Sequence, residues 1–198
     1  MTRDSSALFN LYLDRGFFSP AECVELLRDL SAAPAVPATV HGRGTPSVDE
    51  RVRKVSRLTP CATTLALVTR QLLAARERVA LHFGVPLTTC EEPQFLLYRE
   101  GDFFVAHQDG NTPLLRSALE QSRKVSVVIF LNDQADSVAP GSYGGGLLRF
   151  TEWRADRPRG QHDLAGQAGC FVAFASDTTH EVTPVIRGER YTIVSWYG

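Results

Sequence analysis

The chain has 198 residues, of which 43% are hydrophobic and 22% charged, and its formal net charge is -1. This length fits one domain with a substantial core, and the near-neutral charge gives no reason to expect a nucleic-acid partner. No stretch is long and apolar enough to span a membrane and no apolar leader opens the chain, so we expect a cytoplasmic protein without a membrane partner.

The first third of the chain predicts two helices. The first begins at Pro20, where Ser19 is the expected N-cap and Glu22 completes a capping box. Its apolar stripe is expected to consist of Val24, Leu27 and Leu30. The second helix is predicted from about residue 60 to residue 83, because apolar residues recur there at spacings of three and four. That stripe comprises Leu65, Val68, Leu72, Ala75, Val79 and Phe83.

A segment rich in proline and glycine separates these helices, and we interpret residues 36–52 as a loop that could act as a lid. After Pro93, short segments rich in Val, Ile, Phe and Tyr predict strands. These segments read QFLLY, FFVAH, KVSVVIFLN, LLRF, GCFVAFA, EVTPVI and RYTIVSWY. Their polar or glycine-rich connectors, including residues 133–146, favour an antiparallel sandwich or barrel.

We therefore expect a mainly β fold with N-terminal helices that pack on the outside of the sheet. A single domain is expected over residues 1–198, because the sequence shows neither a repeat of fixed period nor a sign of a second domain. Residues 1–90 would form the helical support and lid loop, and residues 91–198 the β core.

Candidate metal ligands lie at the end of one predicted strand. Alternate residues of a strand point to the same face, so His107 and Asp109 would project together while Gln108 points away. Such a pair on its own more often belongs to a solvated strand face. His180, which follows another predicted strand and a short turn, could supply a third ligand. Two histidines and one carboxylate on one face of an octahedral ion leave positions open for a 2-oxo acid and dioxygen.

Arg190 lies inside the otherwise apolar last strand, where its charge needs a counter-charge or a wet pocket. A guanidinium binds a carboxylate through two parallel hydrogen bonds, so the distal carboxylate of 2-oxoglutarate would be a suitable partner. The alternative is an ion pair with a neighbouring acid, for which Glu181 and Glu189 are the candidates. Thr192, two residues on, shares the strand face of Arg190 and could add a hydrogen bond to the same carboxylate.

The order of these motifs resembles the prolyl 4-hydroxylase group of Fe(II)- and 2-oxoglutarate-dependent dioxygenases, in particular the hypoxia-type and bacterial prolyl hydroxylases. The likeness covers residues 98–198, about half of the chain. It rests on four motifs in chain order. These are HxD, GGxLxF, a strand that begins at a glycine and is followed by SD and then HEV, and GxRYxxxxWY. The matching residues are His107, Asp109, Gly145, Gly146, Leu148, Phe150, Gly169, Ser176, Asp177, His180, Glu181, Val182, Gly188, Arg190, Tyr191, Trp196 and Tyr197.

The resemblance implies a double-stranded β-helix, or jelly roll, with Fe(II) near its open mouth. It implies 2-oxoglutarate as cosubstrate, with Arg190 on its distal carboxylate, dioxygen as co-reactant and ascorbate as an auxiliary reductant. It also implies that Tyr98 faces the cosubstrate, although a core position is an equal alternative. Trp196 would line the pocket wall or belong to the core.

Three functions remain open from the sequence. By analogy with the family, the favoured one is hydroxylation of a prolyl residue in a peptide or protein. The second keeps the chemistry but acts on a small molecule, such as an amino acid or a biosynthetic intermediate. The third is a jelly-roll metal-binding module without turnover, against which the pairing of Arg190 with an intact HxD motif argues. The loops at 36–52 and 133–146 are expected to decide between the first two.

Overall fold

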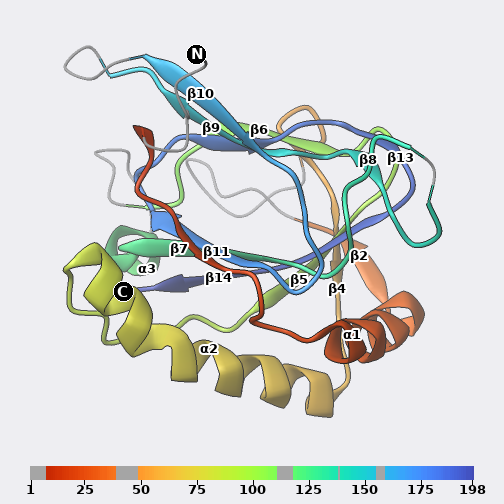
Figure 1. Cartoon of the computed structure of the whole chain (residues 1–198), viewed down its shortest axis with the longest axis horizontal. Helices are drawn as coiled ribbons and strands as arrows, with labels where there is room; N and C mark the ends of the chain where they lie inside the picture. Colours follow the sequence, from red (N-terminus) through yellow and green to blue (C-terminus); the bar gives the residue numbers. More distant parts are fainter. Residues whose placement is uncertain (1–7, 39–48, 111–117, 138, 155–158) are drawn as a thin grey trace.

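Two antiparallel sheets face each other, and two helices cover the outer face of the larger sheet (Figure 1). The computed structural model describes residues 8–38, 49–110, 118–137, 139–154 and 159–198. This arrangement confirms the expected jelly-roll core with N-terminal helices on its outside. Among the described helices, none has both the length and the apolar character that crossing a membrane requires.

The larger sheet has seven strands. Their order is β1 (Tyr12–Asp14), β11 (Phe171–Ala175), β7 (Val125–Phe130), β14 (Arg190–Tyr197), β5 (Gln94–Tyr98), β4 (Ser56–Leu58) and β2 (Ala35–Pro37). The last strand, β14, lies at the centre and pairs with β7 on one side and β5 on the other. Its side chains are therefore fixed from both edges.

The smaller sheet has five strands. Their order is β10 (Gly160–Leu164), β9 (Leu148–Glu152), β12 (His180–Val182), β6 (Phe103–His107) and β3 (Arg53–Lys54). A short pair, β8 (Gly144–Gly145) and β13 (Val185–Arg187), closes one end. Strands from the first 90 residues join both sheets, and the single domain over residues 1–198 stays a prediction.

Helix α1 (Pro20–Ala32) begins as the sequence predicts. The Ser19 hydroxyl accepts a hydrogen bond from the Glu22 N–H at 3.3 Å, and the Glu22 carboxylate accepts from the Ser19 N–H at 2.7 Å. The predicted apolar stripe is confirmed at Leu30, which is buried, and Leu27 is partly buried, but the prediction is wrong at Val24. Cys23 and Leu26 are buried with Leu30, whereas Val24 is 55% exposed. The face of α1 that packs on the sheet therefore includes Cys23 and Leu26.

Helix α2 (Ala62–Phe83) matches its prediction more closely. Its buried apolar residues are Val68, Leu72, Ala75 and Val79, with Leu65 and Phe83 partly buried against the same core. It ends at Gly84, whose φ of 66° is the left-handed conformation that glycine adopts readily.

Several strands were missed from the sequence. Strands β1 to β4 are two or three residues long, and β10 lies in a segment that was predicted to be a connector. The segment EVTPVI, predicted as one strand, is divided into β12 and β13. The short helix α3 (Ala118–Ser122) was also not predicted. Of the expected lid loop at 36–52, the first residues belong to β2, and residues 39–48 lie outside the described part.

A buried hydrogen bond links the central strand to the helical layer. The hydroxyl of Tyr197, at the end of β14, donates to the carbonyl of Leu72 in α2 at 2.7 Å, and both side chains are fully buried. We expect Tyr197→Phe to lower the free energy of unfolding by about 1 kcal/mol, since a typical buried hydrogen bond contributes that much. Urea denaturation would measure the change, and an unaltered midpoint would show that the contact does not stabilise the fold.

Candidate active site

A cavity of about 190 Å³ opens between the two sheets. Both walls are largely apolar, and several polar groups converge on it, which is the usual composition of a small-molecule site. Strand β14 contributes Arg190, Thr192, Val194 and Trp196, the alternate residues of one strand face. From the opposite sheet come His107, Asp109 and His180 together with Phe104, Leu148 and Val182.

The three predicted metal ligands lie together at one end of this cavity. His180 pairs with His107 across β12 and β6, and Asp109 follows directly after β6. The two carboxylate oxygens of Asp109 lie 3.5 Å from Nε2 of His107 and 3.5 Å from Nε2 of His180. One ligand atom from each residue lies within 4.8 Å of the others. This cluster could hold a single divalent ion with open positions.

Backbone contacts orient both imidazoles. Nδ1 of His107 lies 2.8 Å from the Val105 carbonyl, and Nδ1 of His180 lies 3.0 Å from the Thr178 carbonyl. Because a carbonyl only accepts, each Nδ1 must carry the proton, which leaves the lone pair on Nε2 free for a metal. The Phe104 ring stacks on His107 with centroids 3.6 Å apart, which further limits rotation of that imidazole.

The protonation states of Asp109 and His180 favour the binding of a cation. Burial alone would raise the pKa of Asp109, but His180, His107 and the indole N–H of Trp196 outweigh it and hold that pKa far below its usual range. Burial and the neighbouring His107 lower the pKa of His180 to about 4. At neutral pH the site therefore presents a carboxylate and a neutral His180, the forms that bind metal.

Arg190 lies deeper in the cavity and is 1% exposed. Its Nη1 donates to the Thr192 hydroxyl at 3.2 Å, whereas Nε and Nη2 have no hydrogen-bond partner in the described part of the chain. The rings of Tyr98 and Phe130 lie 5.0 and 5.2 Å from the guanidinium carbon. The guanidinium is held in place, yet two of its donors remain available to a ligand.

The alternative of an internal ion pair does not apply. Glu181 pairs with Arg149 at 3.3 Å, and Glu189 pairs with Arg99 at 3.3 Å. Neither acid reaches Arg190, and no ion pair involving Arg190 occurs among the residues that the structure describes. A buried guanidinium without a counter-charge is costly, so a carboxylate-bearing ligand is the partner that the cavity lacks.

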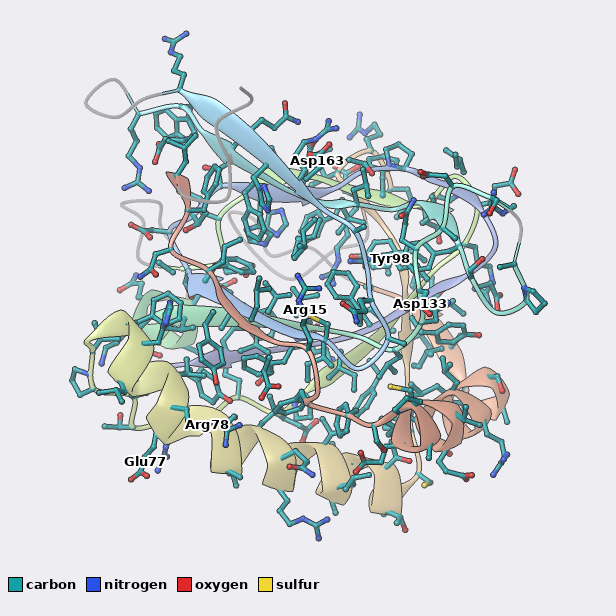
Figure 2. The ribbon with its side chains drawn as sticks, viewed as in Figure 1. Arg15, Glu77, Arg78, Tyr98, Asp133 and Asp163 are labelled. Carbon is teal, nitrogen blue, oxygen red and sulfur yellow. The ribbon has the colours of Figure 1, made fainter. Side chains whose placement is uncertain are left out.

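The remaining predicted residues also line the cavity. Tyr98 lies opposite Arg190 in the β5–β14 ladder and, as Figure 2 shows, between the two sheets. Thr192 lies on the strand face of Arg190, as expected, and its hydroxyl accepts a hydrogen bond from Arg190. Its contact with the cosubstrate carboxylate stays a prediction. Trp196 lies at the metal end of the same face and is 8% exposed.

Other residues of the site were missed from the sequence. Arg123, which the sequence motifs did not single out, lines the cavity and pairs with Glu91. Tyr143 is fully buried beside Arg190; burial raises the pKa of its hydroxyl, and the Arg190 charge opposes that rise. Both residues sit in connectors, so neither strand periodicity nor the motif pattern could place them. Asn132 has a structural role, because its amide oxygen accepts the Tyr191 N–H at 3.0 Å.

The glycine run before β9 allows a close approach to this site, as expected. Gly146 has a φ of 57°, and a Cβ there would lie 2.9 Å from Cδ of Arg190. A side chain at this position would therefore collide with the guanidinium stem as well as strain the backbone.

Residues 93–198 match the model of the 2OG-Fe(II) oxygenase superfamily. The chain belongs to this superfamily. A PKHD-type hydroxylase of Burkholderia ambifaria is 31% identical to it over 180 residues, which are 88% of this chain and 73% of the relative. The PKHD-type hydroxylase YbiX of Shigella boydii is 28% identical over 188 residues, which are 94% and 77% of the two chains. This oxygenase accordingly uses Fe(II) and 2-oxoglutarate.

Solved structures agree with this assignment. A prolyl-4-hydroxylase of Pseudomonas putida superposes with a TM-score of 0.63 at 26% identity and covers 98% of this oxygenase and 95% of its own chain. A prolyl hydroxylase of Trichoplax adhaerens, solved with a peptide fragment of the hypoxia inducible factor, gives a TM-score of 0.71 at 16% identity. It covers 98% of this chain and 86% of its own. The second likeness concerns the fold alone.

The free donors of Arg190 generate a prediction about cosubstrate affinity. We expect Arg190→Met to weaken 2-oxoglutarate binding by about 100-fold or more, because two charge-assisted hydrogen bonds of about 1.5–3 kcal/mol each are lost. Fe(II) binding should stay unchanged. Calorimetric titration under anaerobic conditions would measure both affinities.

Arg99→Met is the matched control, since Arg99 is half exposed and pairs with Glu189 outside the cavity. It should leave 2-oxoglutarate binding intact. Wild-type affinity in Arg190→Met would remove this residue from the cosubstrate site.

Proposed function

We propose that His107, Asp109 and His180 are the ligands of Fe(II) in this oxygenase. Two histidine Nε2 atoms and one carboxylate converge with their tautomers already set, which supports the assignment. The residues fit the metal chemically, because this ligand set leaves open positions that non-haem iron oxygenases require.

Arg190, with Thr192 and Tyr98 beside it, would hold the distal carboxylate of 2-oxoglutarate. The single observation that carries this proposal is the buried guanidinium whose Nε and Nη2 lack partners in the described residues. When bound, iron and 2-oxoglutarate supply the oxidising chemistry. The contribution of the chain is to orient the cosubstrate through Arg190 and to exclude water through apolar walls such as Leu148 and Val182.

We further propose that the substrate is a prolyl residue in a peptide or protein. The support comes from the relatives that are named as hydroxylases and from the prolyl-4-hydroxylase of Pseudomonas putida at 26% identity. Small-molecule hydroxylation is the competing proposal. HygX of Streptomyces hygroscopicus, solved with hygromycin B bound, shares the fold with a TM-score of 0.65 at 15% identity.

The metal assignment predicts a spectroscopic signal. Adding 2-oxoglutarate to the anaerobic Fe(II) protein should produce the visible iron-to-oxo-acid charge-transfer band. Asp109→Ala should lose the band, because a ligand is removed. Asp163→Ala is the control: this carboxylate lies on β10, in the outer layer of Figure 2, and pairs with Arg149. A band of full intensity in Asp109→Ala would contradict the assignment.

The substrate assignment requires a separate assay. A peptide library with a central proline between randomised residues would be incubated with the Fe(II) protein, 2-oxoglutarate and air, in parallel with free amino acids. We expect some library peptides to gain one oxygen atom by mass spectrometry, with proline-to-alanine versions unchanged. Oxygenation of a free amino acid while the library stays unmodified would overturn the peptide proposal and support the small-molecule one.

A further inference from the structure

A charged pair lies inside the metal end of the cavity. Arg123 donates to Glu91 through Nε at 2.6 Å and Nη2 at 2.8 Å, and their side chains are only 12% and 15% exposed. Glu91 is itself fixed to the central strand, because its N–H donates to the Trp196 carbonyl and its carbonyl accepts from the Ser195 hydroxyl, both at 2.8 Å. A bidentate pair this enclosed is rigid but contributes little net stability, so its position points to another role.

The pair holds Trp196. The Arg123 guanidinium lies 3.8 Å from the centroid of the Trp196 ring, a close cation–π contact. Trp196 is 8% exposed and lines the cavity, and its indole N–H has no hydrogen-bond partner among the described residues. Since Arg123 contacts both the Asp109 carbonyl and the Trp196 ring, the indole lies close to Asp109. A buried donor without a partner costs free energy, and a ligand-bearing site beside it explains why the donor is retained.

Arg123 also contacts Asp109 directly. Its Nη1 donates to the Asp109 carbonyl at 3.4 Å, while the Asp109 N–H donates to the Ser176 carbonyl at 2.9 Å. The backbones are close at this point, since a Cβ on Gly110 would lie 2.7 Å from Cβ of Arg123. Asp109 lies two residues after His107, the last residue of β6, and lacks the ladder that fixes a strand residue. Hydrogen bonds from Arg123 and to Ser176 therefore fix the Asp109 backbone in place of a strand ladder.

We propose that Glu91, Arg123 and Trp196 form a positioning stack for Asp109. Arg123 fixes the backbone of this ligand, and the Trp196 indole N–H, which has no partner among the described residues, is the donor that we assign to its carboxylate. Outer contacts of this kind set the orientation and basicity of a metal ligand. The inference rests on the proposed role of Asp109 as an Fe(II) ligand, and it is independent of the proposed substrate because it concerns metal affinity.

The test measures Fe(II) affinity in variants that keep the shape of the stack. Trp196→Phe removes the N–H but keeps an aromatic ring, and Arg123→Lys keeps the charge but loses the bidentate pair. We expect each to weaken Fe(II) binding by about 10-fold or more and to shift the energy of the charge-transfer band with 2-oxoglutarate. Anaerobic calorimetry and visible absorption would record both quantities.

Tyr197→Phe is the matched control. It removes a buried hydrogen bond from the adjacent position of β14 without touching the cavity. It should lower the melting temperature and leave Fe(II) affinity unchanged, which separates metal positioning from simple loss of stability. Glu91→Gln, nearly isosteric, provides a further variant if Trp196→Phe does not fold, and it should also weaken Fe(II) binding.

Coupling between the variants gives the decisive result. Because the Arg123 guanidinium stacks on the Trp196 ring, the two single variants share part of their loss, and the double variant should lose less Fe(II) affinity than the product of the two single losses. Wild-type affinity and an unshifted band in the folded single variants would overturn the proposal, as would strictly multiplicative losses. Either failure would leave the peptide assay unaffected, so it could not be mistaken for failure of the proposed substrate.

Discussion

The buried charge of Arg190 determines how the rest of the site is arranged. A guanidinium that is 1% exposed needs either a counter-charge or hydrogen bonds for its donors. The fold supplies one hydroxyl, from Thr192, and directs the nearby acids Glu181 and Glu189 to other arginines. Since β14 is paired along both edges, the guanidinium cannot move to solvent without breaking the central strand. The cavity is therefore suited to bind an anionic ligand next to Arg190.

Residues that depend on local strand geometry could be predicted from the sequence. A period of two places Thr192 and Trp196 on the face of Arg190, and all three line the cavity. The same period brings His107 and Asp109 to one side, although Asp109 lies just past the end of β6. Strand periodicity alone could not predict the position of His180, because only the pairing of β12 with β6 places it opposite His107. Its assignment depended on the order of motifs as well as on the local pattern.

Non-local contacts account for what the sequence could not reveal. Arg123 stands at the start of a strand, where an arginine is normally solvated, but Glu91 and Trp196 come from distant segments to enclose it. The edge strands β1 and β2 are too short to leave a pattern and exist because a neighbouring strand pairs with them. Likewise, α1 carries apolar residues on two adjoining faces. Only its packing against the sheet determines that the buried face is the one with Cys23 and Leu26.

The site also bears on stability. Nε and Nη2 of Arg190, the indole N–H of Trp196 and the Tyr143 hydroxyl are buried polar groups without hydrogen bonds in the described chain. Arg190 and Trp196 line the cavity, and Tyr143 lies beside Arg190. A buried polar group without a hydrogen bond costs about 1–3 kcal/mol. A carboxylate at Arg190 and a metal-bound Asp109 would return partners to most of them. Ligand binding and folding are therefore thermodynamically linked in this oxygenase.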